Sequence, residues 1–243
     1  MRLLEELQMN ALPALQTILY DGWILRFADG FTNRANSINP IYQHKDNVIE
    51  KIDRCERIYR SKELKPTYKI TALADPENLD ELLENRGYKK IHCTSIQTLH
   101  ISDFPEPDSS LAMTYEYFSD KWFEHYCRLG SISKENSIIY KKMLNNLIPD
   151  AFFTILQIDN EVIACGMAVL EKGYLGLFDI MVCENYRNKG YGTQLLLNIL
   201  KVGRLHGAEN AYLQVMTDNL TALQLYKKLG FKEQYQYFYR VLE

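Results

Sequence analysis

Residues 182–196, "VCENYRNKGYGTQLL", place two cations and two closely spaced glycines immediately before an apolar stretch. The apolar spacing predicts that a strand ends near Val182 and that an amphipathic helix begins at about Gly190. The first amides of a helix lack internal partners and carry partial positive charge, and glycine lets an anion approach the backbone. Since Arg187 and Lys189 lie beside these amides, the segment predicts a seat for a phosphate.

Two well-known phosphate-binding patterns do not fit this segment. A P-loop requires Gly-Lys followed by Ser or Thr, whereas Gly190 is followed by Tyr191. A dinucleotide fingerprint requires a third glycine where this chain has Leu195. The remaining pattern is R-x-x-G-x-G between a strand and a helix.

That pattern resembles the acyl-CoA loop of the GNAT superfamily of N-acetyltransferases. Residues 219–231 also match N-x-x-A-x-x-x-Y-x-x-x-G-F, which this family carries on the helix after the next strand. In this order and at this spacing, the two motifs make residues 111–243 similar to a GNAT domain. One departure is Glu184, which stands where the family often has proline. It puts an acid near the cofactor but leaves the amide cradle intact.

The resemblance implies an acetyl-CoA-dependent N-acetyltransferase that moves an acetyl group to a primary amine by direct transfer in a ternary complex. The pyrophosphate of the cofactor is expected at Arg187, Asn188, Lys189, Gly190, Tyr191, Gly192 and Thr193, mainly on main-chain N–H groups. Main-chain groups of Met181 and Val182 are expected to pair with the pantetheine arm like an added strand. Asn219 is expected either to hydrogen-bond this arm or to cap its helix.

The catalytic assignments also follow from the resemblance. Tyr226 matches the family's usual acid, which protonates the departing thiolate, although an aromatic packing residue would have the same spacing. The base is Asp179, Glu184 or a water molecule, and a structural hydrogen bond is an equally good explanation for Asp179. Strand alternation predicts Asp179 and Met181 on one face, with Ile180 and Val182 on the other.

Periodicity and turn residues predict the elements that position these residues. Helices are expected over 1–16, 47–64, 78–88, 120–130, 134–148, 192–207 and 219–230. Strands are expected over 22–27, 34–42, 66–73, 91–101, 112–118, 210–216 and 233–242, with a three-stranded meander over 151–182. These elements make the fold class α/β (α+β), and the resemblance implies two GNAT-like domains, each a mixed, mostly antiparallel sheet flanked by helices.

A proline-rich, acidic stretch at 101–111 reads as a linker, dividing the chain into a degenerate GNAT-like domain (1–104) and a catalytic domain (105–243). A shift of 143 residues takes Gly30 to Gly173 and Gly87 to Gly230, which indicates a diverged internal repeat. Under this shift the phosphate loop falls on 44–49 and Tyr226 on Leu83, so only the second half is expected to bind CoA. The first half would be a packing partner or a substrate wall.

The polar stretch 31–40 could contribute to such a wall, or it could be a solvated edge strand. The net charge of −3 argues against nucleic acid and anionic membranes, and no apolar run is long enough to span a bilayer. The five cysteines are scattered, which indicates reduced thiols in a cytoplasmic protein and no metal site.

The acceptor is expected to be a small-molecule amine, and no pattern predicts the oligomeric state. Two alternatives stay open: a non-catalytic acyl-CoA sensor, and a protein or peptide N-acetyltransferase.

Overall fold

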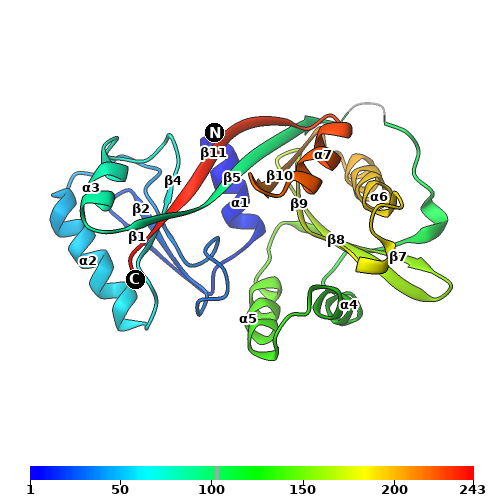
Figure 1. Cartoon of the computed structure of the whole chain (residues 1–243), viewed down its shortest axis with the longest axis horizontal. Coiled ribbons are helices and arrows are strands. Elements are labelled where there is room, and N and C mark those ends of the chain that lie inside the picture. The colour runs from blue at the N-terminus through cyan, green and yellow to red at the C-terminus, as the bar shows by residue number, and fades with distance from the viewer. Residues whose placement is uncertain (102–103) are drawn as a thin grey trace. The chain divides into compact units, whose positions relative to one another are not determined.

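The chain forms two compact units in the computed structural model, which describes residues 1–101 and 104–243 (Figure 1). Unit 1 comprises Met1–Ser95 and Tyr235–Glu243, and unit 2 comprises Ile96–Gln234. The predicted division into 1–104 and 105–243 differs from these units in the placement of 96–104 and 235–243. The linker predicted over 101–111 lies partly at 102–103, outside the described residues.

Unit 1 is a mostly antiparallel sheet with helices. Its helices are α1 (Arg2–Ala11), α2 (Val48–Ser61) and α3 (Leu79–Asn85). Its strands are β1 (Gln16–Tyr20), β2 (Trp23–Phe27), β3 (Ile38–Asn39), β4 (Thr67–Ile70) and the final part of β11 (Lys232–Val241). They are ordered β1-β2-β3-β4-β11, and β3 pairs with β4 in parallel.

Neighbouring residues of β4 show how the helices of unit 1 cover its sheet. Tyr68 belongs to the apolar core that includes Ile52 of α2 and Leu83 of α3. Lys69 instead contacts Glu5 of α1, at 2.7 Å. Because successive side chains of a strand point to opposite faces, α1 lies on one face and α2 and α3 on the other.

Unit 2 contains the meander and the predicted phosphate loop. Its helices are α4 (Asp120–Gly130), α5 (Lys134–Asn145), α6 (Tyr191–Leu205) and α7 (Leu220–Lys228), with short 3-10 turns η1 (Ser109–Leu111) and η2 (Glu184–Tyr186). Its strands are β6 (Ala112–Tyr115), β7 (Asp150–Ile158), β8 (Glu161–Glu171), β9 (Tyr174–Val182), β10 (Asn210–Met216) and the end of β5 (Lys89–His100). They are ordered β5-β10-β9-β8-β7-β6.

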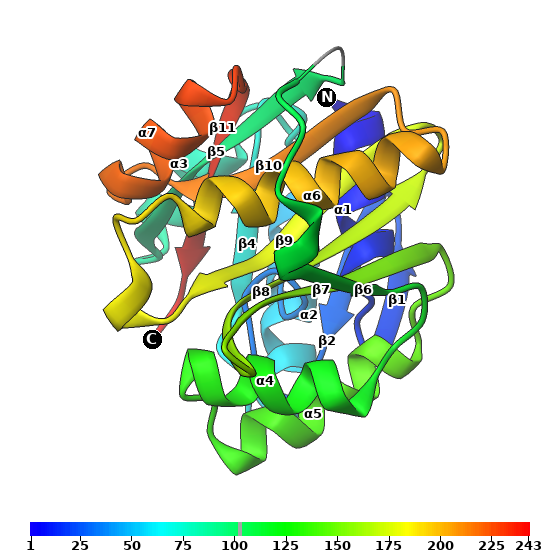
Figure 2. The same ribbon diagram turned by 90° about the vertical axis from the view of Figure 1, so that its right-hand side faces the viewer.

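Two adjacent phenylalanines of β7 separate the two faces of this sheet. The ring of Phe152 contacts His206 at the end of α6, whereas the ring of Phe153 contacts Trp122 of α4. The helix α6 therefore covers one face, and α4 covers the other, as Figure 2 shows. The core of the α6 face also includes Tyr226 of α7.

A β-bulge interrupts β9 just before the predicted loop. Cys165 is opposite Met181 and Met167 is opposite Phe178, so Gly166 faces two residues, Asp179 and Ile180. Asp179 takes a left-handed backbone conformation with φ 54°. The bulge shifts the alternation of the strand, because Leu177 and Ile180, three positions apart, both pack against the α6-side core.

Several features of the two units coincide under the 143-residue shift. After α3, Gly87 N–H donates to Glu84 O and Tyr88 N–H to Leu83 O; after α7, Gly230 donates to Lys227 O and Phe231 to Tyr226 O. The strand β4 likewise falls on the start of β10, and each pairs with a parallel neighbour, although the two registers differ. These coincidences support the internal repeat, which stays a prediction.

The last strand of each half of the chain ends in the unit formed mainly by the other half. The final part of β5 neighbours β10 within unit 2, and the final part of β11 pairs with β4 within unit 1, with Phe238 opposite Ile70. This exchange could not be expected from the linear order of the elements.

Most predicted elements are confirmed, but the strand over 34–42 is wrong. Only Ile38–Asn39 is strand there, because Asn36 organises the loop: its amide oxygen accepts from Ala28 N–H (2.7 Å) and Gly30 N–H (3.0 Å). Asn36 and Asn39 are buried, so the stretch is not a solvated edge strand. The strand β1 was not predicted.

Within the described residues, no helix is long and apolar enough to cross a membrane. The same residues contain no group of three or more metal-ligating side chains that could hold an ion.

Candidate active site

A cavity of about 910 Å³ lies in unit 2, where the end of β9, the start of α6 and one side of α7 converge. Its volume is within the range of about 300–1,000 Å³ that is typical of small-molecule sites. Of the predicted site residues, it is lined by Met181, Val182, Arg187, Asn188, Gly190, Gly192, Thr193, Asn219 and Tyr226. Residues 45 positions apart (226 − 181) are thus brought to one surface.

The N-terminus of α6 opens toward this cavity without a side-chain cap. The first helical hydrogen bond runs from Gln194 N–H to Gly190 O at 3.1 Å. The amides of Tyr191, Gly192 and Thr193 precede this first donor, so the helix itself leaves them without partners. Their partial positive charge makes this end of α6 suitable for an anion.

The two glycines that define the loop are needed for different reasons. Gly190 has φ 87°, a left-handed conformation that side chains disfavour, although its surroundings are open. Gly192 has an ordinary backbone, but a Cβ there would lie 3.3 Å from Leu225 Cδ2 of α7. The first glycine therefore permits the turn, and the second permits α7 to approach α6.

The end of β9 presents a free main-chain edge to the cavity. The pairing of β9 with β10 runs from Tyr174–Asn210 to Leu177–Leu213, whereas β9 continues to Val182. On the other edge, Cys183 N–H donates to Ile163 O of β8 at 2.7 Å. Since main-chain groups alternate along an antiparallel strand, those of Met181 point to β8 and those of Ile180 and Val182 point away from it.

Arg187 occupies part of this edge. Its Nε donates to Val182 O at 3.2 Å, and its remaining guanidinium N–H groups stay available. Lys228, at the end of α7, is the second cation of the lining. Among the described residues, those lining the cavity include no carboxylate, so its charge favours an anionic ligand.

Tyr226 lies in the wall that α7 contributes. Its side chain is 8% exposed, and its ring meets Phe231 edge-on with centroids 5.9 Å apart. Burial raises the pKa of Tyr226 to about 12, so the phenol is protonated at neutral pH. Tyr226 is therefore both a packing residue and a hydrogen-bond donor at the cavity.

The two acidic candidates for the base lie outside the lining. Glu184 is exposed in the short turn η2, where its main-chain oxygen accepts from Arg187 N–H. The carboxylate of Asp179 accepts a hydrogen bond from the phenol of Tyr140 on α5. The predicted alternation is confirmed, because Met181 packs toward Gly130 of α4 while Ile180 packs toward α6.

Lys189 and Tyr191 belong to the loop but are not part of the lining. The Lys189 ammonium lies 5.4 Å from the ring centroid of Tyr186, and that ring meets Tyr191 edge-on. Asn219 lines the cavity and also caps α7, since its side chain accepts from Ala222 N–H at 3.1 Å. Capping is thus the observed contact of Asn219.

Sequence reasoning missed a polar stripe on α7, formed by Thr221, Gln224 and Lys228, all of which line the cavity. These three residues follow one another at intervals of three and four, and helical periodicity could have indicated that they share one face of α7. It also missed Tyr140 and Gly130, because nothing local in the sequence relates α4 and α5 to β9.

Comparison with solved structures identifies the fold. A GCN5-related N-acetyltransferase from Kribbella flavida superimposes with a TM-score of 0.72 at 12% identity, covering 98% of this chain and 93% of that one. A tandem GNAT protein from the clavulanic acid biosynthesis pathway superimposes with a TM-score of 0.62 at 13% identity, covering 81% and 69%. At these identities the likeness defines the fold, which is that of the GNAT superfamily.

Sequence comparison defines the family. Residues 1–240 match the family described as "Probable histone acetyltransferase Rv0428c C-terminal", and the chain belongs to it. The "Uncharacterized N-acetyltransferase YobR" of Bacillus subtilis is 30% identical over 246 residues, 99% of this chain and 98% of that protein. An N-alpha-acetyltransferase of Sulfurisphaera tokodaii is 37% identical over 97 residues, 35% of this chain and 58% of that protein. The protein is thus an acyltransferase of the GNAT type.

Proposed function

We propose that unit 2 is an acetyl-CoA-dependent N-acetyltransferase, which transfers an acetyl group directly to a primary amine in a ternary complex. The observation that carries this proposal is the convergence of the open N-terminus of α6, the free edge of β9 and the protonated phenol of Tyr226 on one cavity. An anion seat, an extended-chain seat and a proton donor together fit an acyl-CoA.

The diphosphate of CoA would bind at the start of α6. The amides of Tyr191, Gly192 and Thr193 would donate to its oxygens, and Arg187 would supply positive charge through the guanidinium N–H groups that Val182 O leaves available. Lys189 would add a solvent-screened attraction, since it lies in the loop but outside the lining. Asn219 would act chiefly by fixing the start of α7.

The pantetheine arm would extend along the free edge of β9. The direction of the main-chain groups favours Ile180 and Val182, rather than Met181, as its hydrogen-bonding partners. Met181 would contribute its side chain to the wall beside Gly130 of α4. The arm would thus be held as an additional strand, with its reactive end near the bulge.

When bound, acetyl-CoA supplies a thioester carbonyl for attack and a thiol as leaving group. The N–H groups at the β9 edge would stabilise negative charge on the carbonyl oxygen, and Tyr226 would donate a hydrogen bond to the departing sulfur. Burial raises the pKa of Tyr226 to about 12, well above that of an ordinary thiol, so complete proton transfer from Tyr226 to the sulfur would be unfavourable. We infer that the proton finally carried by the thiol comes from the attacking amine.

Asp179 is the better candidate for accepting or relaying that proton. It adjoins Ile180 and Met181 of the lining, whereas Glu184 is exposed in η2. A water molecule between Asp179 and the amine would complete the path, because the carboxylate itself is not in the cavity lining. Glu184 would then be a loop residue.

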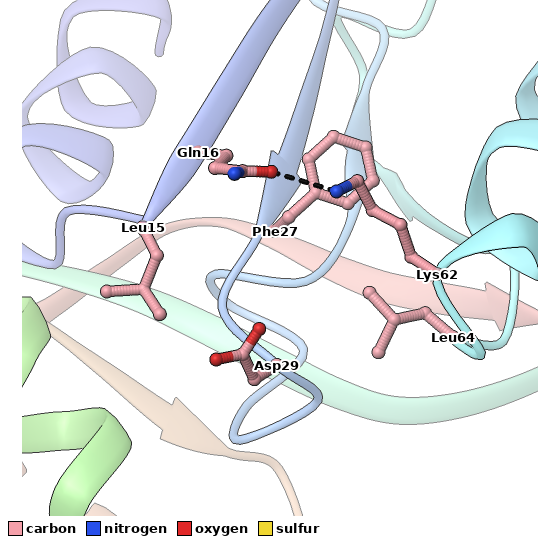
Figure 3. A pocket seen from close by; sticks show the side chains of 6 residues that line it. All are labelled: Leu15, Gln16, Phe27, Asp29, Lys62 and Leu64. Atoms are coloured by element: carbon pink, nitrogen blue, oxygen red, sulfur yellow. Dashed lines mark hydrogen bonds between the residues drawn. The ribbon is translucent and has the colours of Figure 1, made fainter.

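Unit 1 has no comparable seat in its described residues, because its own side chains occupy the corresponding positions. The carboxylate of Asp21 accepts from Lys45 N–H and Asp46 N–H at 3.0 Å, and Asn47 caps α2 by accepting from Ile49 N–H at 2.9 Å. Unit 1 has a different cavity of about 380 Å³, drawn in Figure 3. In its lining, Lys62 Nζ donates a hydrogen bond to Gln16 Oε1 at 2.9 Å. CoA should therefore bind only to unit 2.

The acceptor would be a small-molecule amine, and the free amino group of a peptide is the second candidate. The N-alpha-acetyltransferase relatives favour this second acceptor, although their alignments cover about a third of the chain. Release of free thiol from acetyl-CoA should be measured with polyamines, amino sugars, amino acids and peptides with free N-termini.

Turnover with an amine at a rate well above thiol release without amine would support the proposal. Tight CoA binding without amine-dependent thiol release from any class would instead indicate a non-catalytic sensor. Loss of binding in a variant with Arg187→Ala and Gly190→Ala, but not in Asp21→Ala, would assign the bound CoA to unit 2.

A further inference from the structure

The bulge in β9 determines which main-chain groups reach the cavity, and its central residue is energetically unfavourable in isolation. Asp179 has φ 54°, and a non-glycine residue in this conformation costs roughly 1–2 kcal/mol. The bulge, formed by Asp179 and Ile180, nevertheless leads directly into Met181 and Val182. Ile180, Met181 and Val182 all line the cavity. Surrounding contacts must therefore hold the bulge.

Gly166 supplies the space on the α6 side of the bulge. A Cβ at this position would lie 2.8 Å from Ile180 Cδ1 and 2.8 Å from Ile199 Cδ1. A side chain at Gly166 would therefore force these two terminal methyl groups to shift, and its absence lets Ile180 pack over β8 onto the α6-side core. Gly166 permits the bulge but does not hold Asp179 itself.

Tyr140 supplies the contact on the opposite face. Its phenol donates a hydrogen bond to Asp179 Oδ2 from α5, a helix that begins 45 residues before the bulge residue (179 − 134). The Tyr140 side chain is 1% exposed, and its ring packs 5.2 Å from that of Tyr126 and 6.3 Å from that of Phe123, both on α4. A buried ring held on two sides gives the hydroxyl a fixed position.

We propose that Tyr140 is a positioning residue, whose phenol fixes the carboxylate of Asp179 and thereby the β9 bulge that directs Ile180 and Val182 into the cavity. The inference rests on the proposed function for its kinetic consequence, but its structural consequence stands alone. The hydrogen bond from the Tyr140 hydroxyl to the Asp179 carboxylate is charge-assisted, and charge-assisted hydrogen bonds are about twice as strong as neutral ones. Tyr140 acts through Asp179 and is not among the residues that line the cavity.

The first test measures hydrogen exchange in residues 179–182. In Tyr140→Phe, which keeps the packed ring and removes only the hydroxyl, we expect exchange of this segment to accelerate about tenfold or more. The control is Tyr212→Phe, because Tyr212 is equally buried and meets Phe178 edge-on from β10. Unchanged exchange in Tyr140→Phe, or equal acceleration in both variants, would overturn the proposal.

The second test is a double-mutant cycle with Asp179→Asn. Tyr140→Phe should lower kcat about tenfold while leaving the Kd of CoA within about threefold, because the phosphate seat is on α6. Adding Tyr140→Phe to Asp179→Asn should lower kcat by less than about threefold further, since the two residues act as one unit. Independent, multiplicative effects would contradict a positioning role.

The two tests separate this inference from the proposed function. If the wild-type protein transfers acetyl to no amine, the proposed function fails, yet hydrogen exchange still decides whether Tyr140 holds the bulge. Asp179→Gly provides a further variant, because glycine adopts the left-handed conformation without strain. In that background Tyr140→Phe should no longer accelerate exchange, and continued acceleration would refute coupling through Asp179.

Discussion

Gly190 and Gly207 stand at the two ends of α6 and form a matched pair for testing the phosphate seat. Both have φ 87°, and a Cβ at either position would meet no heavy atom within 4 Å. Replacement by alanine should therefore cost each variant the same backbone strain, about 1–2 kcal/mol. For a chain of this length, that loss lowers Tm by roughly 2–8 °C.

The two variants should differ in ligand binding alone. Gly190 lines the cavity and directly precedes the open amides of α6, so we expect a methyl group there to interfere with an anion at these amides. Gly207 lies beyond the last turn of α6 and is not part of the lining. We expect the Kd of CoA to rise about tenfold or more in Gly190→Ala, which corresponds to about 1.4 kcal/mol, and less than about twofold in Gly207→Ala.

Isothermal titration calorimetry with CoA and thermal unfolding without ligand provide the two measurements. Equal losses of Tm would verify that the strain is matched. If Gly190→Ala then bound CoA like the wild-type protein, or if Gly207→Ala weakened CoA equally, the phosphate would not sit at the start of α6, and the argument from the open amides would be refuted.

Three further predictions test the chemistry and the buried charges. Tyr226→Phe should lower kcat about 10–100-fold with little change in the Kd of CoA. Since burial raises the pKa of Tyr226 to about 12, deprotonation of this phenol should not lower the wild-type kcat below about pH 11. A fall in the wild-type kcat near pH 9 that is absent from the variant would contradict this prediction. The amides of Lys45 and Asp46 hold the pKa of Asp21 well below its usual range, so its stabilisation is fully present above the unfolded pKa of about 3.9 and is lost as pH falls through the folded pKa. Urea midpoints should thus be lower for Asp21→Asn than for wild type at pH 7 and converge in strong acid, and a gap that widened on acidification would reverse the assigned sign. Lys69→Met should cost about 3–5 kcal/mol in urea unfolding because Glu5 is fully buried beside it. Arg60→Ala should cost less than about 0.5 kcal/mol, because the Arg60 guanidinium is exposed and Glu56 keeps its contact with Arg86. Similar costs would argue against a buried pair that depends on both partners.

Local patterns predicted much of the site because hydrogen bonding and side-chain direction in single elements are short-range. The turn at Gly190, the helix after it and the row Asn219–Tyr226 all depend on contacts within a few residues, and they lie as expected along the cavity. The strand expected over 34–42 failed because buried Asn36 bonds the loop internally, an arrangement that depends on tertiary burial. Propensity cannot report which polar residues will be excluded from water.

The sequence alone determined the glycine turn before α6, the helix with Tyr226 and the resemblance that joined them, because each depends on fixed spacing within one element. The tertiary structure decided which edge of β9 is open, since this follows from where its pairing with β10 ends and from the bulge opposite Gly166. It also decided that Asp179 meets Tyr140, because that contact depends on how α5 packs on the sheet. Cross-strand register and helix packing depend on contacts between residues far apart in the sequence, so no single local pattern predicts them.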